Sequence, residues 1–412
     1  MSAQESSGSG GVGTSGASPS GGVISFLSPT LVTTENNGSV GITVQRTGDT
    51  TQAVTVHYET ADQSGSLGVV PCAMVNGIGS SRCDYTTAIG TLQFASGETS
   101  KVFRVLITED SYTEGLEGVQ VTLSNPTNGA VLGTPSTATL EITDDPFEAK
   151  TNEIDNPIAF VTEHYHDFLN REPDPSGLAF WVNEIGSCGG NMQCADVKRI
   201  NVSAAFFLSI EFQETGFFVY RTNKAAYGNR PGEPVPVKFT EFLPDAQRIA
   251  RGVIVGNANW EAQLETNKVA YLTGFVSTSR FTLAYPTILT PTQFVDMLFF
   301  NTGITISDTQ RQAAIDEFAG ATNTLDVAAR VRALRRVVDN AAFKQQEFNP
   351  AFVLMQYFGY MRRNPDATPD TNYTGFQFWL KKLNDFNGSF QDAEMVKAFI
   401  VSTEYRSRFG QP

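Results

Sequence analysis

Eight carboxylates between residues 35 and 145 stand where short predicted strands begin or end. They are Glu35, Asp84, Glu109, Asp110, Glu114, Glu117, Asp144 and Asp145. A calcium ion takes about six to eight oxygen ligands, so several loops must meet at one pole of a domain to hold it. Carboxylates crowded there without a counter-ion would repel one another strongly. We therefore expect a calcium site. The alternative is that these acids only cap strand ends and keep the surface soluble.

The segments that must position these acids alternate between apolar and polar residues. Seven predicted strands lie at 23–26, 40–44, 54–58, 90–94, 102–105, 119–123 and 138–142. This period of two, rich in Val and Thr and interrupted by Gly, Asn, Asp and Pro, is typical of an antiparallel β-sandwich. About seven such strands predict an immunoglobulin-like module.

After Pro146 the period changes to that of helices and continues to about Phe409. Helical units end alike, with a large apolar residue and an aromatic residue six positions apart. These pairs are Phe206/Phe212, Phe275/Phe281, Val337/Phe343 and Phe399/Tyr405. They predict four divergent repeats. The expected fold is therefore all-β plus all-α: a tail at 1–21, a sandwich at 22–146, a linker at 147–157 and a helical repeat bundle at 158–410.

The sandwich resembles the Calx-beta domain. The resemblance rests on Thr34-Glu35-Asn36-Asn37-Gly38, on Cys83-Asp84-Tyr85, on Glu109-Asp110 followed by Glu114 and Glu117, and on the closing Asp144-Asp145. It implies that the eight acids named above are calcium ligands. Exchanger members of the family end in three consecutive aspartates, and here Pro146 occupies the third position. We therefore expect about one to three ions.

The helical half resembles DUF4214, a repeat family of unknown function found in bacterial surface and secreted proteins. Arg171-Glu172-Pro173-Asp174 carries the resemblance, and Arg363-Asn364-Pro365-Asp366 repeats it. Asn170 stands where that turn usually has Gly. Asp174 or Ser176 is expected to cap the following helix. An EF-hand is the less favoured interpretation, because Asn183 stands where its twelfth-position Glu belongs.

The four cysteines form two close pairs, Cys72 with Cys83 and Cys188 with Cys194. Each pair flanks a short Gly-containing loop, which predicts two local disulfides in an oxidising compartment. A single zinc site made from all four is the alternative, although neither pair has the two-residue spacing of a zinc knuckle.

Composition argues against several other functions. The net charge of −14 disfavours nucleic-acid binding. Arg330, Arg332, Arg335 and Arg336 are interpreted as a solvated helix face. No apolar run reaches the roughly 20 residues of a membrane span, and no signal peptide is visible. His164 and His166 lack the spacing of a helical zinc pair, and no nucleophile elbow or phosphate loop occurs. The chain is not expected to be an enzyme.

These observations favour a secreted or cell-surface protein of bacterial type. Calcium would stiffen the sandwich pole and set its angle to the helical domain. The alternative is a matrix-binding or adhesion module whose helical repeats recognise an extracellular polysaccharide or surface protein, with calcium incidental. A hydrolase with an unfamiliar site in the helical half is a third hypothesis, which a buried acid pair would favour.

Overall fold

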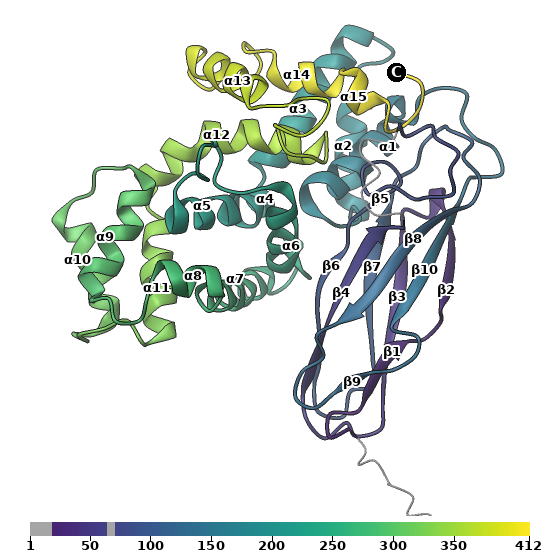
Figure 1. Ribbon diagram of the computed structural model, residues 1–412. Helices are drawn as coiled ribbons and strands as arrows, with labels where there is room; N and C mark the ends of the chain where they lie inside the picture. Colours follow the sequence, from purple (N-terminus) through teal and green to yellow (C-terminus); the bar gives the residue numbers. More distant parts are fainter. Residues whose placement is uncertain (1–18, 64–70) are drawn as a thin grey trace, which may run out of the picture.

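A computed structural model describes residues 19–63 and 71–412, as a β-sandwich joined to an all-helical domain (Figure 1). This confirms the predicted fold class. The tail expected at 1–21 lies outside the described residues up to residue 18. The strands are β1 Val23–Phe26, β2 Thr30–Thr34, β3 Ser39–Thr47, β4 Val54–Asp62, β5 Tyr85–Thr86, β6 Ile89–Phe94, β7 Ser100–Ile107, β8 Glu117–Ser124, β9 Val131–Leu132 and β10 Thr137–Thr143.

The strands form two five-stranded sheets, in the orders β5-β7-β3-β1-β9 and β2-β10-β8-β4-β6. All seven predicted strands are present, but the described residues form ten, so the predicted number was too low. β5 and β9 have only two residues each and therefore show no period. β2 is an edge strand that pairs in parallel with β10 and leaves Val32 exposed, so its alternation is weak.

The core between the sheets follows from the alternation. Ala138, Leu140 and Ile142 of β10 are buried while the residues between them are less so. Ile42 and Val44 of β3, which belongs to the opposite sheet, lie in the same buried core. Each strand thus contributes its inward face to one apolar layer, as expected for sheets about 10 Å apart.

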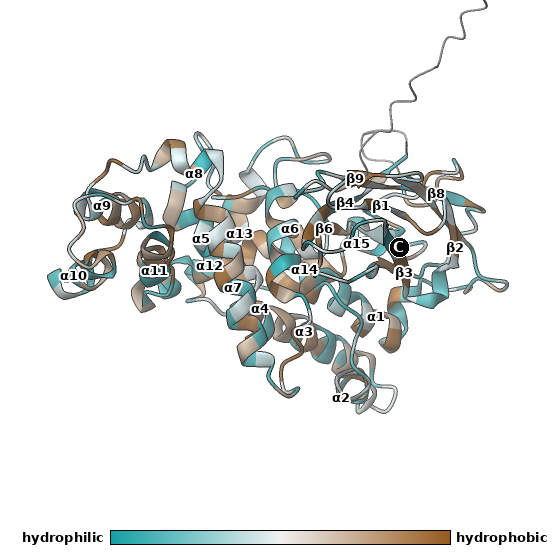
Figure 2. Cartoon of the chain, turned by 90° about the horizontal axis from the view of Figure 1, so that it is seen from below, coloured by the Kyte–Doolittle hydropathy of each residue, from teal (hydrophilic) through white to brown (hydrophobic). Residues whose placement is uncertain are grey.

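The helical domain extends away from the sandwich, and α9–α11 lie at its far end (Figure 2). Its helices are α1 Pro157–His164, α2 Pro175–Gly186, α3 Met192–Leu208, α4 Ile210–Glu214, α5 Gly216–Tyr227, α6 Phe239–Ala250, α7 Trp260–Val276, α8 Ser279–Ala284, α9 Pro291–Thr302, α10 Asp308–Ile315, α11 Val327–Val338, α12 Ala341–Gly359, α13 Thr374–Asp385, α14 Met395–Ile400 and α15 Thr403–Arg406. A π-helical turn, Tyr165–Leu169, continues α1.

The four predicted unit endings share one local geometry. In each, a capping residue lies midway between the paired apolar and aromatic residues. Its own N–H donates to the carbonyl three residues before, and its side chain accepts the N–H three residues after. The capping residues are Ser209, Thr278, Asn340 and Ser402. The recurring six-residue spacing is therefore a helix end followed at once by a capped helix start.

The first and last units are alike in further detail. Asn170 and Arg362 both have left-handed backbone, with φ of 54° and 48°. The next residue, Arg171 or Arg363, donates two side-chain hydrogen bonds to Glu211 or Glu404 respectively. Asn tolerates positive φ better than most residues, which explains its place where the resemblance expects Gly.

Two expectations about individual helical residues have different outcomes. Asp174 caps α2 by accepting the Gly177 N–H at 2.8 Å, as predicted. Arg330 contradicts the interpretation of a solvated arginine face, because it is 2% exposed and its guanidinium lies over the Phe281 and Phe294 rings. Arg332 and Arg336 are exposed and pair with Glu317. Apolar period alone did not distinguish a buried arginine from its exposed neighbours.

Candidate metal centre

The predicted acidic residues come from loops at the end of the sandwich that faces the helical domain (Figure 1). Glu35 follows β2, Asp84 precedes β5, and Glu109 and Asp110 follow β7. Glu114 and Glu117 lie at the start of β8, and Asp144 and Asp145 follow β10. We call these eight residues together with Glu148 the acidic pole. Adjacent antiparallel strands begin and end at the same edge, which brings segments distant in sequence together.

The centre of the acidic pole is a buried group of three carboxylates. Asp84, Asp110 and Glu114 each offer one oxygen, and these oxygens lie within 4.8 Å of one another. The three residues are 4%, 1% and 3% exposed. One oxygen of Asp84 accepts the Ser80 N–H at 2.5 Å, and one of Asp110 accepts the Tyr112 N–H at 2.7 Å. Local turns therefore aim these side chains inward.

Many oxygens of the acidic pole have no hydrogen-bond partner among the described residues. They are Glu35 Oε2, Asp84 Oδ1, Glu109 Oε2, Glu114 Oε2, Glu117 Oε2, Asp145 Oδ1 and Glu148 Oε2. Within 19–63 and 71–412, no lysine, arginine or histidine forms an ion pair with any of these side chains. A buried carboxylate without donor or cation is strongly unfavourable, so this arrangement fits a bound divalent cation.

The pKa values reflect the missing positive charge. Burial, together with the nearby acids Asp110, Glu148, Asp84 and Glu109, raises the pKa of Glu35 to about 11. Burial followed by neighbouring acids raises the pKa of Glu114 to about 9, and that of Glu109 to about 8. Burial is also the main cause of the rise to about 8 for Asp110 and for Glu117. A cation would reverse these shifts, because it favours the charged form.

Asp144 and Asp145 lie at the rim of the group and engage its backbone. Asp144 accepts the N–H groups of Glu114 and Gly115 at 3.1 and 3.0 Å. Asp145 accepts the Asn36 side-chain amide at 2.7 Å, which joins the loop after β10 to the loop after β2. These contacts hold the loops of the acidic pole together even where a side chain offers few free oxygens.

Glu148 belongs to the acidic pole, although the sequence analysis assigned it to the linker. Its carboxylate accepts the Asp145 N–H at 2.7 Å, and it raises the pKa of Glu35 and of Glu114. Pro146 stands where exchanger members of the family have a third consecutive aspartate. Glu148 supplies a carboxylate two residues later. The signal was an acid two residues after Asp144-Asp145-Pro146, but nothing in the pattern indicated that the chain folds back.

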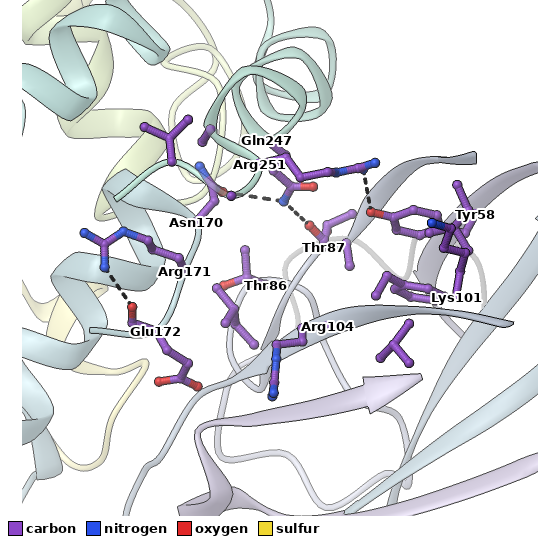
Figure 3. Close-up of a pocket in the computed structure, with 18 of the residues that line it drawn as sticks. Tyr58, Thr86, Thr87, Lys101, Arg104, Asn170, Arg171, Glu172, Gln247 and Arg251 are labelled. Atoms are coloured by element: carbon purple, nitrogen blue, oxygen red, sulfur yellow. Dashed lines mark hydrogen bonds between the residues drawn. The ribbon is translucent and has the colours of Figure 1, made fainter. Parts of the chain in front are cut away.

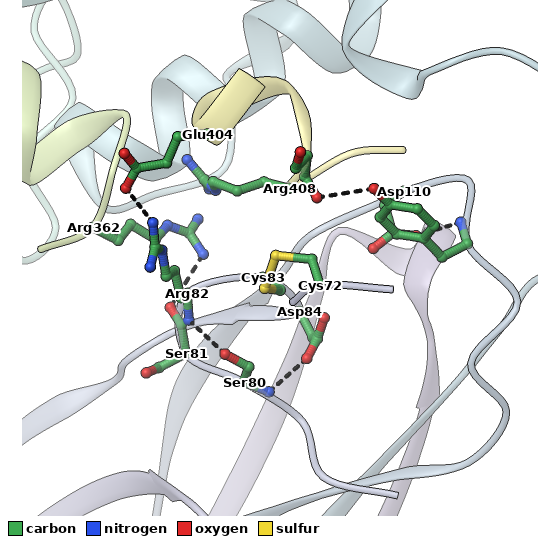
Figure 4. The surroundings of a disulfide bond; sticks show 12 residues. Cys72, Ser80, Ser81, Arg82, Cys83, Asp84, Asp110, Arg362, Glu404 and Arg408 are labelled. Carbon is green, nitrogen blue, oxygen red and sulfur yellow. Dashed lines mark hydrogen bonds and ion pairs between the residues drawn. A yellow bond between two sulfur atoms is a disulfide. The ribbon is translucent and has the colours of Figure 1, made fainter. Parts of the chain in front are cut away.

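The disulfide next to Asp84 lies beside an ion pair that joins the sandwich to the helical domain (Figure 4). Both predicted disulfides, Cys72–Cys83 and Cys188–Cys194, are present, which excludes the zinc alternative. Cys83 directly precedes Asp84. Arg82, on its other side, forms an ion pair with Glu404, which also pairs with Arg363 at 2.6 Å.

A buried ionic network lies behind this contact. Asp167 accepts hydrogen bonds from Arg362 and Arg408 at 2.9 Å each. Arg362 also donates hydrogen bonds to the Tyr85 carbonyl and to the Thr86 hydroxyl, both at 3.0 Å. It therefore contacts both residues of β5, the strand that directly follows Asp84. From the other side, Tyr112 donates to the Gly410 carbonyl at 2.7 Å. Two loops of the acidic pole are therefore held by the helical domain.

The fold and the acidic pole define a class of protein: a β-sandwich with a buried cluster of acids at one end, docked by that end onto a helical domain. Residues 19–146 match the Calx-beta domain family, and residues 142–215 match the domain of unknown function DUF4214. The chain thus carries a Calx-beta domain followed by a DUF4214 segment, in the predicted order. The DUF4214 match ends at residue 215, well before the end of the predicted repeat region.

Among curated proteins, sodium/calcium exchanger 1 of Bos taurus is 32% identical over 158 residues, which are 34% of this chain and 15% of the exchanger. The extracellular matrix organizing protein FRAS1 of Mus musculus is 32% identical over 145 residues, 34% of this chain and 3% of that protein. The chain therefore spans a small part of these relatives. The apo-form Calx CBD1 domain is 28% identical, with 30% of this chain and 96% of that one covered and a TM-score of 0.26.

The remaining site expectations concern the helical half. Trp181 and Trp379 are half-buried and pack against the helical core, as expected for core anchors. No helix among the described residues is both long and apolar enough to cross a membrane. His164 and His166 are both buried, and His166 lies 3.4 Å from Glu163 and from Glu172. This contact gives His166 a structural partner on each side.

Proposed function

We propose that this chain is a calcium-binding structural protein of the bacterial type, secreted or attached to the cell surface, and that it is not an enzyme. The observation that carries the proposal is the acidic pole, whose buried oxygens lack partners and which forms no ion pair with a cationic side chain in the part of the chain that the structure describes. Asp84, Asp110, Glu114 and Glu117 would hold calcium at its centre. Glu35, Glu109, Asp144, Asp145 and Glu148 would complete the ligands or hold a second ion. The similarity to sodium/calcium exchangers supports this assignment.

We further propose that calcium fixes the sandwich against the helical domain. Asp84 lies between Arg82 and the Tyr85 carbonyl, both of which contact helical-domain residues. Asp110 lies next to Ser111 and Tyr112, which contact the backbone of Phe409 and Gly410. An ion bound between Asp84 and Asp110 would therefore order the two loops that carry them, and both loops contact the helical domain. Two disulfides support an oxidising compartment outside the cytoplasm, where calcium is abundant.

The test is a calcium titration by calorimetry, together with melting curves with and without calcium. We expect binding heat and a rise in melting temperature for the wild type, and a loss of both in the Asp84→Asn/Asp110→Asn double variant. Asp144→Ala should weaken binding less, because Asp144 already accepts two backbone N–H groups. Asp49→Asn is the matched control, since Asp49 is a half-buried acid in the turn between β3 and β4, at the opposite end of the sandwich. A wild type that shows neither heat nor thermal stabilisation would refute the proposal.

A further inference from the structure

A cleft of about 900 Å³ lies between the sandwich and the helical domain. We call it the interdomain cleft. One wall consists of β4, β6 and β7, and the other of α6 with the segment after it and the turn at Asn170–Glu172. Its volume lies within the roughly 300–1,000 Å³ of typical small-ligand sites, which often form at domain interfaces.

Specific hydrogen bonds hold the two walls at a fixed separation (Figure 3). Gln247 of α6 donates to the Thr87 carbonyl at 2.6 Å and accepts the Ile89 N–H at 3.2 Å. Arg251 donates to the Thr91 carbonyl at 2.8 Å and to the Tyr58 hydroxyl at 3.1 Å. A Cβ at Gly90 would lie 2.6 Å from the Arg251 guanidinium, so the glycine permits this approach. Hydrogen bonds between the two domains therefore fix the walls of the interdomain cleft relative to each other.

The charge of the cleft is opposite to that of the whole protein. Four basic side chains line it, Lys101, Arg104, Arg171 and Arg251, against one acid, Glu172, in a chain of net charge −14. Lys101 pairs with Glu98, and Arg171 pairs with Glu211. Glu172 lies against His166.

Arg104 and Arg251 differ from the other two basic side chains of the cleft in their contacts, although the positive charge of Arg104 helps to lower the pKa of Glu172 after the larger effect of His166. Neither forms an ion pair with a carboxylate in the described part of the chain. Arg104 donates one hydrogen bond, to the Ser39 hydroxyl, and Arg251 donates two, both to neutral groups. A guanidinium has five N–H donors in a planar fork, so both side chains keep donors for an anion.

The neutral part of the lining is rich in hydroxyl and amide groups. Thr86, Thr87, Gln93, Asn170 and Gln247 all border the space. Such groups hydrogen-bond to sugar hydroxyls, and planar guanidinium groups match planar carboxylates with two parallel bonds. The lining therefore combines donors for carboxylates with partners for a polyhydroxylated ring.

We propose that the interdomain cleft binds a short acidic saccharide, with Arg104 and Arg251 contacting uronic-acid carboxylates. This function goes beyond calcium binding and uses different residues. The positive lining concentrates anions at a surface that elsewhere repels them, which accounts for selectivity toward acidic over neutral sugars.

The experiment is a calorimetric titration of the full chain with a short oligogalacturonate, with its methyl ester as the uncharged comparison. Free calcium is removed by desalting beforehand. We expect binding of the acid and at least about tenfold weaker binding of the ester. Arg104→Gln and Arg251→Gln should each weaken binding of the acid about tenfold, because each removes a charge-assisted contact. Lys381→Gln, an exposed lysine on α13, makes the same charge change elsewhere and should leave binding unchanged.

The Asp84→Asn/Asp110→Asn double variant separates this proposal from calcium binding. Sugar binding should persist there, because the interdomain cleft contains neither residue. Four results would overturn the proposal: no binding of the acid, equal binding of the ester, an equal loss in Lys381→Gln, or a loss confined to the calcium-site variant. Circular dichroism of each arginine variant confirms that it is folded before its affinity is compared.

Discussion

At the scale of single residues, calcium binding at the acidic pole would be coupled to the release of protons. Each buried carboxyl group there has a pKa above its ordinary value because burial and neighbouring acids disfavour its charged form. Glu35, with a pKa raised to about 11, and Glu114, with one raised to about 9, are mostly protonated at pH 7 in the absence of metal. A calcium ion needs the charged forms, so these protons must leave when it binds.

We predict that calcium binding at pH 7 releases about one proton or more for each ion bound. The measurement is calorimetry in two buffers with different ionisation enthalpies, in which the observed heat should differ in proportion to the protons released. Affinity should rise between pH 6 and about pH 9 as the competing protons dissociate. Heats that are identical in the two buffers would contradict the prediction.

The metal-free protein should show the opposite dependence on pH. A carboxyl group with a higher pKa in the folded than in the unfolded state holds its proton more tightly when folded. Its contribution to stability is therefore present at low pH. It is lost as pH rises from about 4.5, the ordinary pKa of Glu, through folded values of about 8 to 9.

At the scale of elements, a disulfide constrains the loop that carries Asp84. Cys83 is bonded to Cys72 and directly precedes Asp84, whereas Cys188–Cys194 joins the loop after α2 to α3 in the helical domain. A ligand on a constrained loop loses less conformational entropy when it binds metal than a ligand on a free one. The two disulfides are of similar local type, so one serves as the control for the other.

We predict that Cys72→Ser/Cys83→Ser lowers calcium affinity about tenfold, equivalent to about 1.4 kcal/mol. The double variant Cys188→Ser/Cys194→Ser should change calcium affinity less than about twofold. Calorimetric titration of both variants makes the comparison. Equal affinities in the two variants would show that the disulfide does not position Asp84.

At the scale of the whole molecule, Arg362 joins the two domains. It lies in the left-handed turn after α12, bonds Asp167 of the first helical unit, and donates to the backbone and hydroxyl groups of β5. Both Arg362 and Asp167 are buried, so their mutual contact is not exposed to solvent screening. Removing one partner of a buried ionic contact leaves an uncompensated charge.

We predict that Arg362→Gln lowers the free energy of unfolding by about 3 kcal/mol, the lower end of the range for buried pairs, because Arg408 still contacts Asp167. Differential scanning calorimetry should then show two unfolding transitions, one for each domain. Calcium should raise the melting temperature of the sandwich transition only. Arg332→Gln, which removes an exposed ion pair on α11, should cost less than about 1 kcal/mol. A calcium-dependent shift of both transitions in Arg362→Gln would argue against this route of coupling.

The sequence by itself determined what depends on neighbouring residues. Alternation located seven strands, and short cysteine spacings indicated the disulfides. Apolar and aromatic residues six positions apart, such as Phe206 and Phe212, marked positions where one helix ends and the next begins. Strand period, helix capping and short loops are local effects, so the pattern carries them directly.

Only the tertiary structure decided which distant groups meet. Arg362 contacts Tyr85 across 277 residues, Glu148 folds back from a predicted linker, Arg330 is buried, and the interdomain cleft forms between β7 and α6. Such contacts depend on how complete elements pack and on where charge can be compensated at their junction. A linear pattern states a side chain's type and its face on an element, but it does not state what stands opposite that face.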